Sequence, residues 1–160
     1  MRNRGTIGGS LANNDPAADY PAAVLALNAT VVTNKRQIPA DQFFTGLFST
    51  ALEPGELVVR ISFPIPEKAD YAKFEQRASR YALVGVFVAK SAAGVRVAVT
   101  GAGMNGVFRA TDIEKALSTN WSAVAAKAIK FPATGILADL HGSADYRAAL
   151  VSVMASRAVS

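Results

Sequence analysis

Residues 4–21 read R-G-T-I-G-G-S-L-A-N-N-D-P-A-A-D-Y-P and contain the most informative pattern in the chain. Consecutive glycines can expose backbone N–H groups as a concave anion site, and the start of a following helix adds its dipole. Thr6 and Ser10 flank Gly8-Gly9 and can add hydroxyl donors. The pattern suits a phosphate-binding loop, although paired glycines also occur in ordinary turns. It is neither a Walker loop nor a G-x-G-x-x-G dinucleotide fingerprint.

The composition favours one domain of ordinary size or two small subdomains. The chain has 160 residues, of which 51% are hydrophobic, enough to supply a core. The 17 Lys and Arg residues outnumber the 12 Asp and Glu residues, giving a net charge of +5 that could favour an anionic ligand. The nearest basic cluster, Lys73, Arg77 and Arg80, is interpreted as a solvated face. We therefore expect no nucleic-acid partner.

The absence of cysteine limits the chemistry of the chain. It excludes disulfides and thiolate-held zinc or iron-sulfur clusters on this chain. A single histidine, His141, argues against a transition-metal site, and its place before Gly142-Ser143 fits a loop residue beside a helix cap. No run approaches the roughly 20 apolar residues of a membrane span. We expect a cytoplasmic protein whose redox chemistry, if any, needs a borrowed cofactor.

The amino-terminal third predicts short helices and a hairpin. Asp15 and Asp19 each stand where a carboxylate can cap a helix that begins near a proline, and a helix with an apolar stripe at 20, 23, 24 and 27 follows. Residues 29–32 and 35–38 predict the two strands of a hairpin, and 41–44 one further helical turn. A subdomain boundary is expected between residues 44 and 53.

The middle of the chain predicts an antiparallel sheet. In residues 57–63 the odd positions are apolar, which is typical of a half-buried strand whose odd positions face the core. Residues 71–77 predict a second strand. Segments 83–89 and 95–100 flank a short loop, which favours a hairpin. We expect these segments to form one sheet of three or four strands.

Helices are predicted for the remainder. Thr111 to Glu114 fits a capping box, Ser122 can cap a second helix, and Ser143 can cap a third. The third helix has its expected apolar face at positions 146, 150, 153 and 154. Strands followed by helices, without regular alternation, indicate an α+β fold.

The longer string at residues 4–21 closely resembles the second flavin-binding segment of the FAD-carrying medium subunit of molybdenum hydroxylases. This family includes the carbon monoxide dehydrogenase flavoprotein and the middle region of xanthine dehydrogenase. The similarity continues, in the same order, through residues 43–46, 53–57, 73–82 and 139–143. The resemblance implies the end of a PCMH-type FAD-binding subdomain over residues 1–45. A carbon monoxide dehydrogenase flavoprotein C-terminal-like domain would follow over 50–157, with about three helices packed on the sheet.

The resemblance also implies which residues bind FAD. The glycine-rich segment would support the cofactor through backbone amides and short side chains, and its members are Thr6, Ile7, Gly8, Gly9 and Ser10. Asp19 would accept a hydroxyl of the cofactor, with helix capping as the alternative role. Tyr81 falls where the family brings a residue near the flavin ring, with a packing tyrosine as the alternative. Val58 lies on the strand that in some members touches the cofactor, but it is interpreted as a core residue. Gln76 stands where xanthine-dehydrogenase-like members carry lysine, which argues against a charge contact there.

The implied function is that of an oxidoreductase subunit. In the family, the flavin receives electrons from [2Fe-2S] clusters on a small subunit, which takes them from a molybdopterin-binding large subunit, and passes them to an acceptor. The family carries a first FAD subdomain ahead of the segment present here, so we expect weak or no FAD retention unless another chain completes the site. We also expect either an exposed apolar patch or a partner behind Ile7, Leu11 and Leu27. The alternative is a non-catalytic interaction module or relic fragment that docks on sister subunits without retaining FAD.

Overall fold

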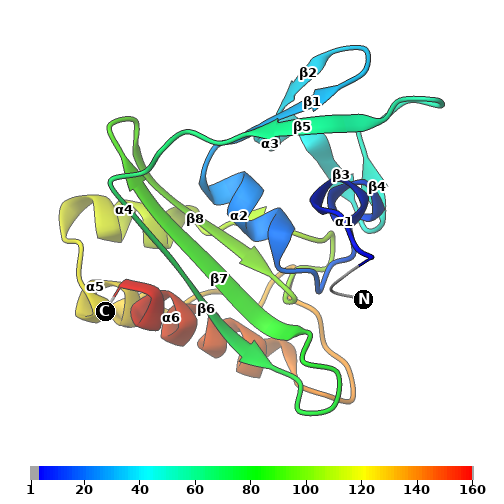
Figure 1. Ribbon diagram of the computed structural model, residues 1–160. Helices are drawn as coiled ribbons and strands as arrows, with labels where there is room; N and C mark the ends of the chain where they lie inside the picture. Colours follow the sequence, from blue (N-terminus) through cyan, green and yellow to red (C-terminus); the bar gives the residue numbers. More distant parts are fainter. Residues whose placement is uncertain (1–3, 160) are drawn as a thin grey trace.

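The computed structural model describes residues 4–159, and Figure 1 shows its arrangement. The elements of the amino-terminal part are α1 (Ile7–Asn13), α2 (Tyr20–Ala26), β1 (Thr30–Thr33), β2 (Gln37–Pro39), α3 (Ala40–Phe43), β3 (Phe44–Gly46), β4 (Ser49–Thr50) and β5 (Val58–Ser62). The elements that follow are β6 (Lys68–Glu75), β7 (Ala82–Ser91), β8 (Gly94–Thr100), β9 (Phe108–Arg109), α4 (Thr111–Thr119), α5 (Ala123–Ala128) and α6 (Ala144–Val159). Among residues 4–159, no helix has the length and apolar character needed to cross a membrane.

The larger sheet has the strand order β6-β7-β8-β9, with every neighbouring pair antiparallel. The predicted hairpin is confirmed as β7 and β8, joined by a tight turn at which Ser91 pairs with Gly94. Helices α4, α5 and α6 cover one face, and α2 packs on the other (Figure 1). Because β7 is covered on both faces, its side chains are nearly all buried. The predicted α+β fold is therefore confirmed.

A smaller sheet of order β2-β1-β5 contains the predicted hairpin of β1 and β2. The strand predicted at 57–63 does not join the larger sheet, because β5 pairs antiparallel with β1. Its expected orientation is also wrong, since Leu57 and Val59 are 67% and 68% exposed. The cause is a register shift at Val32/Thr33 in the pairing of β1 with β5. The shift breaks the regular alternation of β5 side chains between the two faces of the sheet, so Val58 and Ile61 are both partly buried. The division into residues 1–45 and 50–157 stays a prediction.

Of the three caps predicted for the helices that follow the sheet, two are confirmed. Ser122 Oγ accepts the Ala125 N–H at 3.2 Å, and Ser143 Oγ accepts the Tyr146 N–H at 3.2 Å. The capping box at residues 111–114 is wrong, because α4 has no side-chain cap. Glu114 instead turns inward, where its carboxylate accepts the buried Val97 N–H at 2.9 Å and two bonds from Arg109.

The buried faces of α2 and α6 differ from the predicted stripes. On α2, Tyr20 is exposed, and the predicted contact at Ala23 is only partly buried. On α6, Tyr146 is also exposed, whereas Leu150 and Met154 are buried as expected. The buried residues of α6 are Arg147, Ala148, Leu150, Val151, Ser152, Met154, Ala155 and Ala158. The buried face thus includes small residues and one arginine, which an apolar stripe alone does not predict.

A buried carboxylate closes the smaller sheet and gives a testable pH dependence. Glu56 accepts bonds from Arg36 Nε at 3.0 Å, the Glu53 N–H at 2.8 Å and the Thr33 hydroxyl at 2.7 Å. These bonds, the one from Arg36 above all, lower the pKa of Glu56 from 4.5 to about 2. A carboxylate with a lowered pKa contributes stability above its unfolded pKa that disappears as the pH falls through its folded pKa.

We therefore expect the free energy of unfolding to decline between pH 4.5 and about 2, and Glu56→Gln to make that decline shallower. Urea unfolding at about pH 6 and about pH 3 measures the effect. Glu67→Gln, at an exposed position, is the control. Equal declines for the wild type and Glu56→Gln would show that Glu56 does not carry this pH dependence.

Candidate functional site

The glycine pair lies in the first turn of helix α1 and does not form an open turn. Thr6 is the N-cap: its Oγ1 accepts the Gly9 N–H at 3.0 Å, and its carbonyl accepts the Ser10 N–H at 3.0 Å. Within the described residues, the N–H groups of Ile7 and Gly8 have no acceptor, as expected for the first positions of a helix. This helix start therefore presents two open donors and the Thr6 hydroxyl.

Leu11 anchors α1, because its side chain is fully buried in the core shared with α2 and β1. The exposed patch predicted behind Ile7, Leu11 and Leu27 is therefore wrong for Leu11. Leu27 is partly buried, and Ile7 is 37% exposed. The apolar surface left open at this end of the molecule lies along β5 instead.

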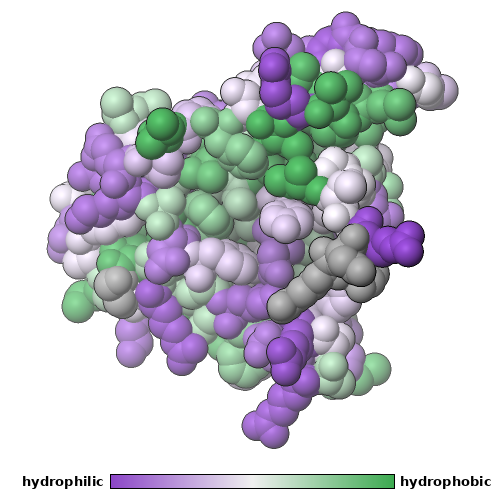
Figure 2. Space-filling view, viewed as in Figure 1, coloured by the Kyte–Doolittle hydropathy of each residue, from purple (hydrophilic) through white to green (hydrophobic). Residues whose placement is uncertain are grey.

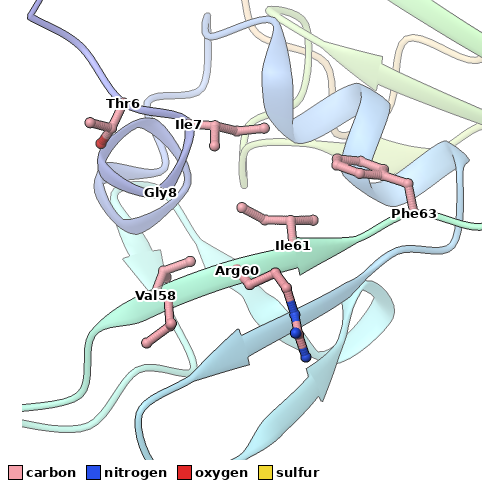
Figure 3. A pocket seen from close by; sticks show the side chains of 8 residues that line it. Thr6, Ile7, Gly8, Val58, Arg60, Ile61 and Phe63 are labelled. Carbon is pink, nitrogen blue, oxygen red and sulfur yellow. The ribbon is translucent and has the colours of Figure 1, made fainter.

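An open pocket of about 360 Å³ lies between α1 and β5. Figure 3 shows Ile7, Ile61 and Phe63 around its opening, while the Arg60 side chain points away from α1. The lining residues are Thr6, Ile7, Gly8, Val58, Val59, Arg60, Ile61 and Phe63. The structure thus brings together three of the predicted site residues. Val58, for which the sequence favoured a core role over a cofactor contact, is partly buried against the core and also lines the pocket.

Helix α1 faces Val58 of β5 at Gly8. A Cβ added there would lie 3.5 Å from the Val58 Cβ and carbonyl oxygen, which is ordinary van der Waals contact, so alanine would fit and a longer side chain would occupy the pocket. At Gly9 an added Cβ would lie 3.0 Å from Thr6 Oγ1, the atom that caps the helix.

The chemistry of the pocket fits part of an FAD molecule. Open N–H donors at a helix start suit phosphate oxygens, and the apolar wall of β5 suits an aromatic ring. Gly9 and Ser10 belong to the same helical turn, but they do not line the pocket. Their N–H groups are already bonded to Thr6, so their part in binding would be through the shape of the turn.

Asp19 lies outside this pocket. It occupies the N-cap position of α2, but its side chain makes no capping hydrogen bond, so the capping role considered for its carboxylate is wrong. Its carboxylate accepts a bond from the Tyr71 hydroxyl at 2.5 Å and another from Lys73 Nζ at 2.9 Å. Lys73 is therefore not part of a solvated basic face. Sequence reasoning missed Tyr71 and Lys73 as a pair, although their i, i+2 spacing on a predicted strand places both side chains on one face.

Tyr81 lies at a second depression, of about 260 Å³, and not in the pocket with Thr6. This depression is also lined by Pro16, Ala17, Gln76 and Arg147, so it borders the segment that joins α1 to α2. The predicted site residues therefore occupy three places: the first turns of α1 beside its pocket with β5, the Asp19 carboxylate and the Tyr81 depression. The segment at 14–19 leads from α1 to Asp19 and borders the Tyr81 depression at Pro16 and Ala17.

Comparison with known proteins identifies relatives over nearly the whole chain. Residues 1–66 match the FAD binding domain in molybdopterin dehydrogenase. The nicotine 6-hydroxylase medium subunit of Paenarthrobacter nicotinovorans is 36% identical over 99% of this chain and 61% of its own length.

Two solved structures show the same fold. Quinoline 2-oxidoreductase from Pseudomonas putida 86 matches with a TM-score of 0.80 and 30% identity, over 99% of this chain and 60% of that one. Carbon monoxide dehydrogenase from Hydrogenophaga pseudoflava matches with a TM-score of 0.77 and 33% identity, with the same coverage of 99% and 60%. The chain thus spans about three-fifths of the length of these relatives. Sequence and fold together place the chain in the family of FAD-binding medium subunits of molybdenum hydroxylases.

Proposed function

We propose that this chain supplies one side of an FAD site in the medium subunit of a molybdenum-dependent oxidoreductase. The observation that carries the proposal is the capped start of α1, whose Ile7 and Gly8 N–H groups are open beside an apolar pocket. These donors, with the Thr6 hydroxyl, would hold phosphate oxygens. The turn formed by Gly9 and Ser10 would fix their direction.

The other two proposed contacts extend the site beyond the pocket. Asp19 retains lone pairs that can accept a hydroxyl of the cofactor, because each of its oxygens accepts one hydrogen bond, from Tyr71 and from Lys73. Tyr81, beside the depression that borders Pro16 and Ala17, would lie near the flavin ring. FAD, when bound, supplies the redox chemistry, and this chain's residues bind and orient it.

The proposed assembly contains two further subunits. A molybdopterin-binding large subunit and a small subunit with [2Fe-2S] clusters would deliver electrons to this subunit, which would pass them to an external acceptor. A cytoplasmic location belongs to the same proposal. The support is the likeness to medium subunits and the pocket described above.

Reconstitution with FAD tests the proposal. The chain is mixed with FAD alone, and then with a separate chain that carries the first FAD subdomain of a medium subunit. We expect weak retention alone, because this chain provides only some of the contacts, and stronger retention with the added chain. Each missing hydrogen bond to a charged group weakens binding by about 1.5–3 kcal/mol. Absence of flavin in both mixtures would refute the proposal.

Valine at Gly8 or Gly9 should abolish any FAD retention. At Gly8 the added side chain occupies the pocket beside Val58, and at Gly9 it displaces the Thr6 cap. Gly8→Ala should retain more affinity than Gly8→Val, because its Cβ fits. Ala12→Val, at an exposed position on the same helix, is the matched control. Flavin fluorescence measures the affinities, and unchanged retention in Gly8→Val and Gly9→Val would show that the α1 assignment is wrong.

A second candidate function, docking on another chain without FAD, is favoured by the apolar surface along β5. Figure 2 shows hydrophobic side chains gathered over this strand. Val59, Phe63 and Ile65 are among the exposed large hydrophobic residues, and within the described residues β5 pairs with β1 alone. Size-exclusion chromatography separates the two functions in part. A colourless and stable monomer that never takes up flavin would favour the docking module.

A further inference from the structure

We infer that Tyr71 and Lys73, together with Gly85 and Thr100, form a clamp that fixes Asp19 and the segment before it, and that Tyr71 and Lys73 are positioning residues for the cofactor. The cofactor part of this inference rests on the function proposed above. We call these four residues the Asp19 clamp. They come from β6, β7 and β8, so the larger sheet itself would set the position of the carboxylate.

Tyr71 and Lys73 occupy one oxygen of Asp19 each. The Tyr71 hydroxyl donates to Oδ1 at 2.5 Å, and Lys73 Nζ donates to Oδ2 at 2.9 Å and to the Arg80 carbonyl at 3.1 Å. The Asp19 side chain is nevertheless 46% exposed. An ionised carboxylate can accept about four hydrogen bonds, so two directions remain for a ligand. The two donors fix the plane of the carboxylate and leave its outer side open.

Gly85 makes room for the Tyr71 ring. A Cβ at this position would overlap the Tyr71 hydroxyl oxygen and would lie 2.8 Å from Thr100 Cγ2. Glycine is disfavoured inside a strand unless another group must come close, and here the phenol crosses β7 at that point. Tyr71 also stacks on Phe87, with ring centroids 6.1 Å apart. Burial, and then the bond to Asp19, raise the pKa of Tyr71, so its hydroxyl stays a donor.

Thr100 holds the backbone that leads to Asp19. Its Oγ1 lies 2.9 Å from the Pro16 carbonyl and 2.7 Å from the Ala18 carbonyl, and the neighbouring Gly101 N–H donates to Pro16 at 2.8 Å. The segment 16–19 is therefore held by its main chain and by its terminal side chain. Such a fixed carboxylate can select a ligand hydroxyl at one position, which a freely rotating aspartate cannot do.

Binding of FAD to the chain, with and without the added subdomain chain, tests the positioning role. We expect Tyr71→Phe and Lys73→Met each to weaken FAD binding about tenfold. In an Asp19→Ala background, neither change should weaken binding further, because both residues act through Asp19. Tyr146→Phe, which removes the hydroxyl of an exposed tyrosine on α6, is the control and should have no effect. Unchanged binding in Tyr71→Phe, or equal losses with and without Asp19, would overturn the positioning role.

Amide hydrogen exchange tests the clamp without the cofactor. The Ala17 and Ala18 N–H groups lie within the segment 16–19 and donate to Asp15. They should exchange several-fold faster in Tyr71→Phe and Gly85→Ala. Amides of α6 should not change, which excludes general unfolding. Unchanged exchange at Ala17 and Ala18 would overturn the clamp itself. If the wild type binds no FAD in any mixture, the proposed function and the cofactor role both fail, and the exchange result alone decides whether the clamp exists.

Discussion

Replacing Arg147 with methionine is expected to lower the free energy of unfolding by about 3 kcal/mol. Arg147 lies on α6 and is only 3% exposed. Its Nη1 donates to the Leu83 and Gly101 carbonyls, each at 2.9 Å, and its Nη2 donates to Asp139 at 2.6 Å. Methionine fills much of the same space but offers no donor. Two buried carbonyls would then lose their partner, and the bond that holds the loop at Asp139 would be lost.

Chemical unfolding followed by far-UV circular dichroism measures this loss. Arg157→Met is the matched control, because Arg157 lies on the same helix but is exposed, and a change within about 0.5 kcal/mol is expected. Arg147→Lys should fall between the two, since an ammonium cannot reproduce the fork of a guanidinium. Equal stabilities for Arg147→Met and Arg157→Met would mean that the buried bonds of Arg147 contribute nothing net.

Gly101→Ala is the second change with a large expected effect, again a loss of about 3 kcal/mol or more. Gly101 has a φ of +81°, and an added Cβ would overlap the Ala82 carbonyl oxygen and lie 2.9 Å from that of Leu83. Both neighbours are backbone and cannot rotate away. The backbone movement needed to relieve this overlap would also disturb the Gly101 N–H bond to the Pro16 carbonyl, which ties the segment between α1 and α2 to the sheet.

Gly135→Ala separates the effect of backbone strain from that of steric overlap at Gly101. Gly135 has a similar φ of +77°, but an added Cβ there would meet nothing within 4 Å. Gly135→Ala should therefore lower the free energy of unfolding only by the strain of a left-handed backbone, about 1–2 kcal/mol. The difference between the two variants in thermal or urea unfolding reports the overlap at Gly101. A loss at Gly101 no larger than that at Gly135 would contradict this explanation.

Local signals predicted most elements that form and cover the larger sheet correctly. Ser122 and Ser143 mark real helix starts, and the residues around Gly94 form the predicted hairpin turn. The failures occur where tertiary contacts decide the outcome. Glu114 does not take part in a capping box because its carboxylate accepts the buried Val97 N–H instead. The strand at 57–63 joins β1, and its faces follow from an irregular pairing that alternation alone does not reveal.

The same distinction holds for the candidate site, where neighbours in sequence were predicted and contacts between distant segments were not. The residues of the glycine-rich segment were found together because they are adjacent in sequence, and Thr6 proves to be a helix cap. Helix propensity does not predict a helix across Gly8-Gly9, which is stabilised by that cap and by the burial of Leu11. The partners of Asp19 were missed because Tyr71 lies 52 residues away, and only the folded sheet brings the two together.

The most direct test of the proposed FAD site is the response of individual backbone amides to FAD. In 15N-correlated NMR spectra of the labelled chain, saturating FAD should shift the Ile7 and Gly8 resonances, because their N–H groups are the open donors at the start of α1. The Gly94 resonance, at the far hairpin turn, should stay in place. Shifts at Ile7 and Gly8 without a change at Gly94 are the predicted result. No shift at Ile7 and Gly8 while other resonances respond to FAD would contradict the account.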